Sequence, residues 1–411
     1  MGQKLGPRIL LALSAVGPGL FLIGYNIGTG SVTTMAKAGA EYGMTLFWAL
    51  LLSAIFTYVL MVAYGKVTLV TGKTALFNIK NYFTIGPVLA IYILIALVTG
   101  ELLAIMGVMG IVVDLLAEGW KLLGWGEANT FRITLVLVIL LFILLWFGHY
   151  RSFERVLTFF VILMGLCFIL VFFLVKPDIK EIARGMIPSV PNQPGAFQLV
   201  AAMAGTTCSA AVFIVRSTVV VEKGWTIHDL KGEKKDAFVS AATMLVLSGI
   251  IMAVSAGTLH VMGLKLDNTI EMIQLFEPIG GKFAAFILIL GIAGAGLSTV
   301  FPIILIAPWL ICDYSGTDRN IKSPLFRILG GLGLLFAFGL QILEQKPPAM
   351  MVFSQAFQAM ILPAVAIPIF LLISDGKLMG RHQAGIRMRL GLMAVIIFSL
   401  ITTYFAVIDL I

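Results

Sequence analysis

Eleven long runs of predominantly apolar residues are the feature that most constrains how this chain folds. Each run is long enough for a helix that crosses the bilayer core, which requires about 20 residues. Barrel strands are shorter and alternate in polarity, so the runs predict membrane-spanning helices. We expect spans near 8–40, 44–71, 85–117, 130–149, 154–176, 196–221, 236–262, 282–312, 325–343, 349–374 and 387–410.

The composition agrees with this prediction and excludes several classes of protein. Of the 411 residues, 60% are hydrophobic and only 12% are charged, whereas soluble domains carry about 25% charged residues. A soluble enzyme, a disordered protein and a nucleic-acid-binding protein are therefore excluded, and we expect no nucleic-acid partner. The net charge of +8 comes from basic residues in short loops between the apolar runs.

The basic residues also predict the orientation of the chain. With the N-terminus in the cytoplasm, the cytoplasmic loops hold about twice as many lysines and arginines as the outer loops. No cleavable signal peptide is evident. We expect an integral protein of a bacterial inner (plasma) membrane, with a cytoplasmic N-terminus and an outer C-terminus. Residues 1–411 are interpreted as a single membrane domain, and the polar segment 222–236 as a solvated cytoplasmic loop.

Two of the runs are interrupted near their middle by glycine and hydroxyl residues. The first break extends from Asn26 to Ser31, and the second, in the sixth run, from Gly205 to Ser209. Glycine disfavours a helix by about 1 kcal/mol, and irregular backbone at membrane depth is tolerated only inside protein or along a cavity. Paired breaks of this kind, five spans apart, indicate the binding site of a secondary transporter. Close packing of helices through small residues is the alternative interpretation.

Four motifs in the same order give the chain a resemblance to a known family. They are Gly-Pro-Gly at 17–19, AGAEYGMTLFWALLLS at 38–53, GHYRSFERV at 148–156 and SQAFQAMILPAVAIPIFLLISDGKLMG at 354–380. Together they resemble the NRAMP (natural resistance-associated macrophage protein) family of divalent metal transporters. The resemblance implies an all-α, leucine-transporter-like fold with alternating access to a site at the middle of the membrane. It also implies two inverted five-helix repeats, at about 8–176 and 196–374, and an eleventh helix at about 387–410.

The chain departs from this family where its members bind metal and carry protons. The family's Asp-Pro-Gly-Asn motif falls at Gly28, Thr29, Gly30 and Ser31, and its Met-Pro-His motif at Ser209, Ala210 and Ala211. Of the three acidic residues in the family's third helix only Glu101 is retained, because the other positions are Val108 and Ile111. The family's second sixth-helix histidine corresponds to Arg216, which cannot release a proton. We therefore expect a divergent member with altered or absent proton coupling.

The breaks still predict a polar substrate site. We expect it to be formed by Asn26, Gly28, Thr29, Ser31, Thr206, Thr207, Ser209 and Gln355. Neutral oxygen ligands suit a hard, partly hydrated ion such as Mg²⁺ or Mn²⁺, but a dication without a countercharge is unfavourable in a low-dielectric site. A small neutral, zwitterionic or anionic organic solute is the alternative, since half-helix N-termini favour negative groups.

Two charged residues inside predicted spans form a candidate charge network. Glu101 lies about mid-span, and Arg216 lies about 10 Å along the helix from Ser209. One hypothesis pairs Arg216 with Glu101, so that the arginine takes the place of a transported proton, with Arg327 as a competing partner of the glutamate. Snorkelling of Arg216 to the membrane surface is the alternative.

The sequence thus favours a secondary membrane transporter, first of a divalent cation and second of an organic solute. Its expected partners are the transported cation or solute and the lipid bilayer, and we expect no cofactor and a monomer or weak oligomer. An intramembrane enzyme or a non-transporting receptor is a weaker alternative, because no nucleophile–base pair, phosphate-binding loop or paired carboxylates are evident.

Overall fold

The computed structural model describes residues 28–147, 150–317 and 319–408, and these segments are helical almost throughout. Within them, 10 helices are long and apolar enough to cross a membrane. These helices correspond to the second to eleventh predicted spans, whereas most of the first span lies outside the described residues. Large apolar side chains such as Phe131, Ile139 and Phe147 are exposed on the outside of the bundle, as lipid contact requires. The all-α membrane class is confirmed.

The elements of the first half are α3 (Thr29–Tyr42), α4 (Phe47–Thr71), α5 (Ala75–Tyr82), α6 (Gly86–Leu122), α7 (Thr130–Phe147), α8 (Tyr150–Val175) and α9 (Ile179–Arg184). Those that follow are α10 (Ala196–Thr207), α11 (Ala210–Glu222), η1 (Ile227–Asp229), α12 (Leu230–Ser255), η2 (Ala256–His260), η3 (Thr269–Ile279) and α13 (Gly281–Ser315). The last are α14 (Pro324–Leu335), η4 (Phe336–Phe338), α15 (Gly339–Leu343), α16 (Pro347–Ser374), α17 (Gly376–Met379), η5 (Gly380–His382) and α18 (Ile386–Ile408).

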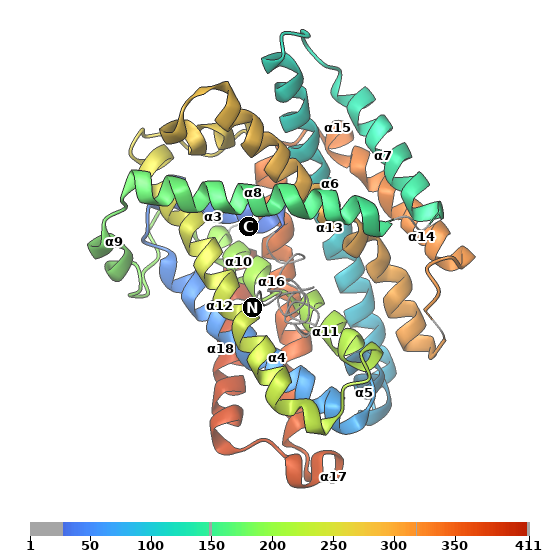
Figure 1. Cartoon of the computed structure of the whole chain (residues 1–411). Coiled ribbons are helices and arrows are strands. Elements are labelled where there is room, and N and C mark those ends of the chain that lie inside the picture. The colour runs from blue at the N-terminus through green and yellow to red at the C-terminus, as the bar shows by residue number, and fades with distance from the viewer. Residues whose placement is uncertain (1–27, 148–149, 318, 409–411) are drawn as a thin grey trace, which may run out of the picture.

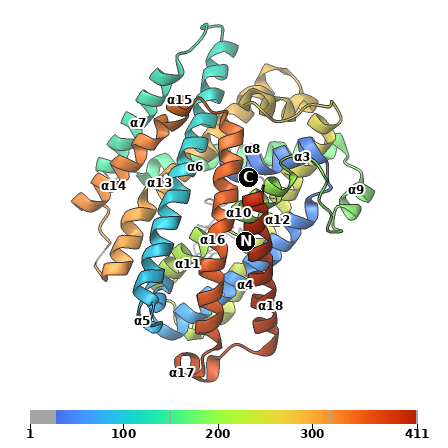
Figure 2. The ribbon, with the colours of Figure 1, turned by 180° about the vertical axis from the view of Figure 1, so that it is seen from behind.

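Helix α16 lies at the centre of the bundle. It packs against α6, α10 and α18, and the view from behind shows α6 and α18 on either side of it (Figure 2). Helix α13 packs against α6 and α8, and α12 packs against α3 and α4. Helix α8 runs across the bundle rather than along it (Figure 1). Residues from α3, α6, α10, α13 and α16 therefore meet in the interior.

Small residues allow these helices to approach closely. A Cβ atom on Gly205 of α10 would lie 1.8 Å from the carbonyl oxygen of Gln355 in α16. A Cβ atom on Gly107 of α6 would lie 3.0 Å from the Cα atom of Met351, also in α16. Glycine at both positions brings backbones together, as is common between helices in membranes.

The sixth predicted span is broken where its sequence predicts. Helix α10 ends at Thr207 and α11 begins at Ala210, and the two residues between them have non-helical backbone. Helix α3 begins at Thr29 after an extended Gly28. The described part of the first break is therefore also the start of a helix.

The polar segment 222–236 differs from the predicted solvated loop. Helix α12 begins at Leu230, and both Glu233 and Asp236 are buried on its first turns. The cause is tertiary, because both carboxylates lie against Arg216 of α11. The prediction of a solvated charge run is wrong for this part of the segment.

Candidate functional site

A cavity of about 50 Å³ lies between the two breaks. Its lining comes from the two breaks and from three further helices, α6, α13 and α16. The lining residues are Gly28, Gly30, Ser31, Glu101, Ala104, Val108, Thr206, Ser209, Thr299, Ile303, Gln355 and Gln358.

Five of the residues predicted for the substrate site line this cavity. They are Gly28, Ser31, Thr206, Ser209 and Gln355. Thr29 and Thr207 are buried close by in sequence but do not belong to the lining. Asn26 lies outside the described residues.

A direct contact joins the two breaks. The hydroxyl oxygens of Ser31 and Thr206 lie 3.0 Å apart, and both side chains are buried. Thr57 of α4 donates a hydrogen bond of 2.8 Å to the carbonyl oxygen of Thr207. This contact satisfies one of the carbonyl groups that the end of α10 leaves without a helical partner. The second break is therefore supported by a neighbouring helix.

Glu101 brings a carboxylate to the cavity. Its side chain is buried, lines the cavity and accepts a hydrogen bond of 3.0 Å from Nε2 of Gln358. The other amide atom of Gln358, Oε1, is buried and has no hydrogen-bond partner among the described residues. Glu101 and Gln358 thus bring a carboxylate and an amide to the lining of the cavity, and carboxylate and amide oxygens are ligands of hard cations.

The sequence did not predict this arrangement. The sequence predicts Glu101 in a charge network and not in the substrate site, and it does not predict Gln358 or Thr299 at this site. Gln358 lies three residues after Gln355, so both are on one face of a helix. That spacing was the available signal for Gln358. No comparable signal marks Thr299, whose position in the cavity depends on how α13 packs.

The rest of the lining is neutral. Two of its side chains lie so close to the first break that glycine is the residue that fits there without displacing them. A Cβ atom on Gly28 would lie 2.5 Å from Cγ2 of Thr299, and one on Gly30 would lie 2.9 Å from Nε2 of Gln355. Val108, at an acidic position of the resembled family, lines the cavity with an apolar side chain. Among the described lining residues Glu101 is therefore the one acidic group.

Arg216 lies in neither of the two places predicted for it, which are beside Glu101 and at the membrane surface. Its side chain is 0% exposed, so it does not snorkel to a surface. Its partners are Glu233, at 2.8 Å from Nη2, and Asp236, at 3.0 Å from the same atom. The predicted pairing of Arg216 with Glu101 is wrong, because two carboxylates at the start of the adjacent helix are closer.

Arg327 is also distant from the predicted network. It lies on α14, donates a hydrogen bond of 3.1 Å to the backbone of Trp146, and places its guanidinium 4.4 Å from the centre of that indole ring. Its contacts are therefore with α7. The prediction that it competes for Glu101 is not supported by these contacts.

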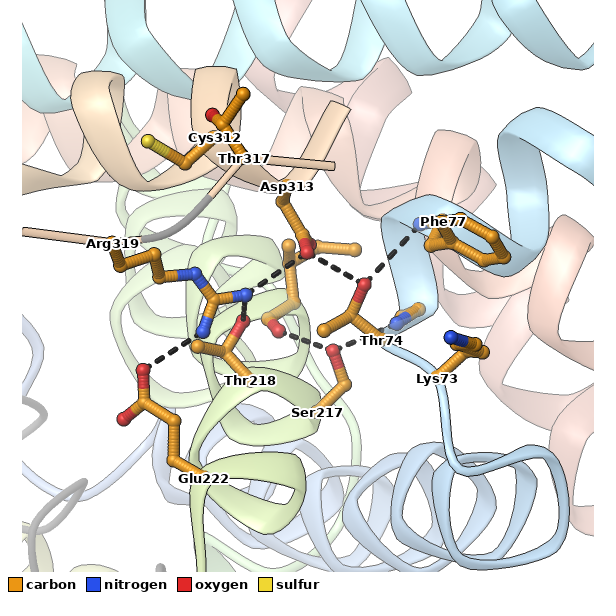
Figure 3. A network of polar contacts seen from close by, with 12 residues as sticks. Lys73, Thr74, Phe77, Ser217, Thr218, Glu222, Cys312, Asp313, Thr317 and Arg319 are labelled. Atoms are coloured by element: carbon orange, nitrogen blue, oxygen red, sulfur yellow. Dashed lines mark hydrogen bonds and ion pairs between the residues drawn. The ribbon is translucent and has the colours of Figure 1, made fainter. Parts of the chain in front are cut away.

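A polar network joins α11 to α13 and α5 at the end of the molecule where α5 and α17 lie (Figures 1 and 3). Arg319 donates to Glu222 at 2.8 Å and to Asp313 at 2.9 Å. Thr74, just before α5, donates to the same oxygen of Asp313 at 2.7 Å. Ser217 of α11 accepts a backbone N–H from the first residue of α5 at 2.9 Å. The end of α11 remote from the break is thus held to its neighbours.

The described residues offer no metal cage of the kind that soft ligands build. Among the residues from 28 to 408 whose side chains the structure describes, which leaves out 148–156, 277–279, 281–283 and 318, no group of 3 or more His, Cys, Asp and Glu side chains is placed to hold a metal ion. A cation in the cavity would instead be bound by one carboxylate, by amide and hydroxyl oxygens and by water.

Comparisons of the sequence give a consistent result over almost the whole chain. The family model described as natural resistance-associated macrophage protein-like, Nramp, matches residues 19–409. A divalent metal cation transporter MntH of Staphylococcus saprophyticus is 24% identical over 402 residues, with 90% of this chain and 86% of the relative covered. A protein of the same description from Pectobacterium carotovorum is 25% identical over 385 residues, with 91% and 89% covered.

Solved structures share the fold. The manganese transporter of Eremococcus coleocola, in complex with an aromatic bis-isothiourea compound, has a TM-score of 0.71 at 16% identity and covers 99% of this chain and 88% of its own. The transporter MhsT in complex with L-phenylalanine has a TM-score of 0.63 at 14% identity, with 96% and 98% covered. The leucine-transporter-like fold is confirmed by these likenesses.

Proposed function

Because the chain belongs to the Nramp family, we propose that it transports a divalent metal cation and that the cavity between the two breaks is its substrate site. The family model covers residues 19–409, and relatives described as divalent metal cation transporters match most of the chain. The family consists of membrane transporters, so the expectation that the chain is not an enzyme is confirmed. The substrate and the site residues are the proposal.

The observation that carries the proposal is the meeting of Glu101 and Gln358 at the cavity wall. The sequence offered no carboxylate at the breaks, which was the main argument against a dication. Glu101 supplies that countercharge from α6, and Gln358 of α16, which donates to it at 3.0 Å, lines the cavity beside it. The hydroxyls of Ser31 and Thr206 are close enough to bind the waters that Mg²⁺ or Mn²⁺ retains.

The ligand set favours a hard ion over a soft one. The positions where the family carries Asp, Asn and Met ligands are Gly28, Ser31 and Ser209 in this chain. Without a thioether at the sixth-helix break, affinity for soft transition metals is reduced, while carboxylate, carbonyl and water ligands suit Mg²⁺ and Mn²⁺. We therefore propose Mg²⁺ or Mn²⁺ as the substrate, bound with part of its hydration shell.

The size of the cavity favours an ion over an organic solute. A volume of about 50 Å³ accommodates about four water-sized groups, at roughly 10–15 Å³ each. Pockets for drug-sized molecules measure about 300–1,000 Å³. An organic solute is therefore the second candidate, and it requires that the cavity expand in another state of the transport cycle.

We propose that α11 moves during this cycle. It begins at the break that lines the cavity, and its other end is held by the Arg319 network (Figure 3). Breaking the contacts of Arg319 with Glu222 and Asp313 frees α11 and opens a path from the cavity to that end of the molecule. The positive-inside bias supports the proposal that this end faces the cytoplasm of a bacterial inner membrane, with a cytoplasmic N-terminus and an outer C-terminus. We propose a monomer or weak oligomer.

The direct test combines metal binding with flux. The purified protein should gain thermal stability with Mn²⁺ or Mg²⁺, by about 2.7 kcal/mol at a concentration 100-fold above Kd, and should carry the same ion into proteoliposomes. Glu101→Gln removes the charged ligand and should weaken metal binding by about 10- to 100-fold. Glu118→Gln, on the same helix but outside the cavity, is the matched control and should bind as the wild type does.

Two outcomes would contradict the proposal. The first is the absence of a thermal shift and of flux with Mn²⁺, Mg²⁺ and Ca²⁺. The second is metal binding that Glu101→Gln leaves unchanged, which would place the metal elsewhere.

A further inference from the structure

We infer that Asp313 is a proton-binding site and that its protonation releases the end of α11. The carboxylate lies near the end of α13, in the polar network that joins α11, α13 and α5 (Figure 3). The inference rests on the movement of α11 proposed above, and it adds the event that starts this movement. The site is separate from the substrate cavity, whose lining does not include Asp313.

The two oxygens of the Asp313 carboxylate have different surroundings. Oδ1 accepts hydrogen bonds from Oγ1 of Thr74 at 2.7 Å and from Nη2 of Arg319 at 2.9 Å. Oδ2 is buried and has no hydrogen-bond partner among the described residues. The side chain of Asp313 is only 7% exposed, so bulk water does not replace the missing donor. Oδ2 is therefore the atom that is suited to bind a proton.

Two opposing effects act on the charge of this carboxylate. An anionic oxygen that is buried without a donor destabilises the ionised form. The Arg319 cation and the Thr74 hydroxyl stabilise the same form through Oδ1. A proton on Oδ2 removes the buried charge and leaves the hydrogen bond from Thr74 in place. Asp313 is thus ionised while Arg319 is bound to it, and protonation competes with that ion pair.

The nearest charged groups have partners of their own. On α11, Glu222 is bonded to Arg319 at 2.8 Å, and its side chain is 57% exposed. On α5, Lys80 donates to the carbonyl oxygen of Tyr314 at 2.6 Å and lies 4.1 Å from the centre of that ring. Lys80 is therefore held by backbone and ring, and Arg319 is the cation that is bonded to Asp313 among the described residues.

The other elements around α13 bring their charges to different places. Lys73, just before α5, lies 5.3 Å from the ring centre of Phe77. Arg327 of α14 contacts α7. Helix α6 has no acidic or basic residue before Glu101, which lines the cavity. Helix α8 meets α13 in the first half of that helix, far from Asp313. The ionisation of Asp313 therefore depends chiefly on Arg319.

Arg319 transmits the state of Asp313 to α11. While Asp313 holds Nη2, Nη1 donates to Glu222 at 2.8 Å, and Nη2 also donates to Thr218 at 3.5 Å. The guanidinium is a rigid fork, so an anchor on one side orients the other. Without that anchor Arg319 keeps only an exposed carboxylate, and exposed ion pairs contribute little. The bond from the first residue of α5 to Ser217 is then the main remaining contact in this network.

This arrangement predicts that acidic solution favours the conformation in which α11 has moved. The closed conformation holds Asp313 ionised, because Arg319 is bound to it. Release of Arg319 leaves a buried carboxylate that takes up a proton. The conformation that binds more protons is favoured as pH falls. Proton coupling then occurs at a location other than Val108 and Ile111, where the resembled family carries acidic residues.

Distances between spin labels test the inference in the full chain without metal. Labels are attached at Asn81→Cys on α5 and Lys223→Cys at the end of α11, which are both exposed positions. The three native cysteines are replaced by alanine in this background. From neutral to acidic pH, the otherwise unaltered protein should gain a population with a longer distance. Asp313→Asn, which cannot ionise, should show this population at both pH values in the same proportion.

Two variants of Thr74 test whether Asp313 is the titrating group. Thr74→Val removes the hydroxyl that donates to Oδ1. The ionised form loses a donor, so the midpoint of the transition should move to higher pH by roughly one unit. Thr74→Ser retains the hydroxyl and is the matched control, with an unchanged midpoint. Both variants leave Arg319 and Glu222 intact, and they test the site even if Asp313→Asn does not fold.

Three results would overturn the proton site. The first is the absence of a pH-dependent change in distance when Asp313 is present, and the second is a change that persists in Asp313→Asn. The third is an equal midpoint in Thr74→Val and Thr74→Ser, which would assign the transition to another group.

Mn²⁺ flux in proteoliposomes separates this inference from the proposed function. If Mn²⁺ neither binds nor moves while the labels report the expected transition, the proposed substrate is wrong and the proton site stands. If Mn²⁺ moves while the labels report no transition, the proton site is wrong and the proposed cation transport stands.

Discussion

The cavity and the buried group of Arg216, Glu233 and Asp236, called here the arginine cluster, are both polar regions in an apolar bundle, but they satisfy their polar groups in opposite ways. In the cavity, hydroxyl, amide and carboxylate groups line open space, and Oε1 of Gln358 has no protein partner among the described residues. In the arginine cluster, Arg216 is held by Glu233 and Asp236 at 2.8 and 3.0 Å. The cavity is suited to exchange a ligand with water, whereas the cluster holds charges that belong to the chain.

This difference explains why charge is distributed so unevenly. The chain presents a single acidic group at the described lining of the cavity, and the countercharge to Arg216 is placed on the next helix. Under the proposed function, a transported cation is then bound in the cavity without competition from a fixed arginine.

Removal of the arginine should destabilise the protein most. Arg216→Ala leaves two buried carboxylates without their cation, and breaking a buried ion pair in this way costs about 3–5 kcal/mol. The unfolding free energy lost in Arg216→Ala should become smaller as pH falls, because a protonated carboxyl group is neutral and is not destabilised by the absence of a cation. Arg327→Ala is the control, since that side chain is partly exposed and stacks on Trp146, an interaction of about 1 kcal/mol. If denaturant unfolding gives equal losses of unfolding free energy for the two variants, the distinction between the buried Arg216 and the partly exposed Arg327 is contradicted.

Tight packing around the cluster predicts a second difference. A Cβ atom on Gly65 would lie 1.9 Å from Oε1 of Glu233, which Arg216 holds in place. Gly65→Ala should therefore cost about 1–3 kcal/mol of unfolding free energy. Gly30→Ala is the matched change in the cavity, where the added methyl meets the end of the Gln355 side chain next to open space.

Gly65 lies in the interior of α4, where alanine also gains helix propensity, whereas Gly30 is the second residue of α3, where this gain is smaller. The comparison therefore depends on the steric cost, which is larger at Gly65. Gly30→Ala should therefore be the less destabilising of the two. A larger loss for Gly30→Ala would show that the cavity is the more rigid region.

The contact across the breaks predicts the smallest effect. Ser31→Ala removes the hydroxyl that lies 3.0 Å from that of Thr206, and a buried hydrogen bond of this kind contributes about 1 kcal/mol. Ser315→Ala, at an exposed hydroxyl bonded within its own helix, should change the unfolding free energy by less than about 0.5 kcal/mol. Indistinguishable thermal stabilities of the two variants would refute a role for Ser31 in joining the breaks.

Much of the architecture was predictable because it depends on local properties of the chain. Hydropathy placed the 10 described spans, and the glycine and hydroxyl residues before Ala210 located the break between α10 and α11. The family resemblance gave the fold. The predicted repeat boundaries, the oligomeric state and the orientation of the termini stay predictions.

The partners of charged residues were not predictable to the same degree. The sequence favours a pair of Arg216 and Glu101 because both lie inside predicted spans, whereas Glu233 and Asp236 lie in a segment predicted to be a loop. In a linear sequence, a run of charged residues before a membrane span predicts a solvated loop. The packing of α11 and α12 against α4 excludes water from this part of segment 222–236. Glu233 and Asp236 thereby become the partners of the buried Arg216.

By itself, the sequence determined the membrane environment, the approximate positions of the 10 described spans and the position of the second break, since each follows from hydropathy and backbone preference within one segment. The tertiary structure decided which helix faces meet. It placed Glu101 and Gln358 of two distant helices at the same cavity, at 3.0 Å from each other, and gave Arg216 its two carboxylates. Helical periodicity assigns a residue to a face, but only packing determines what that face touches.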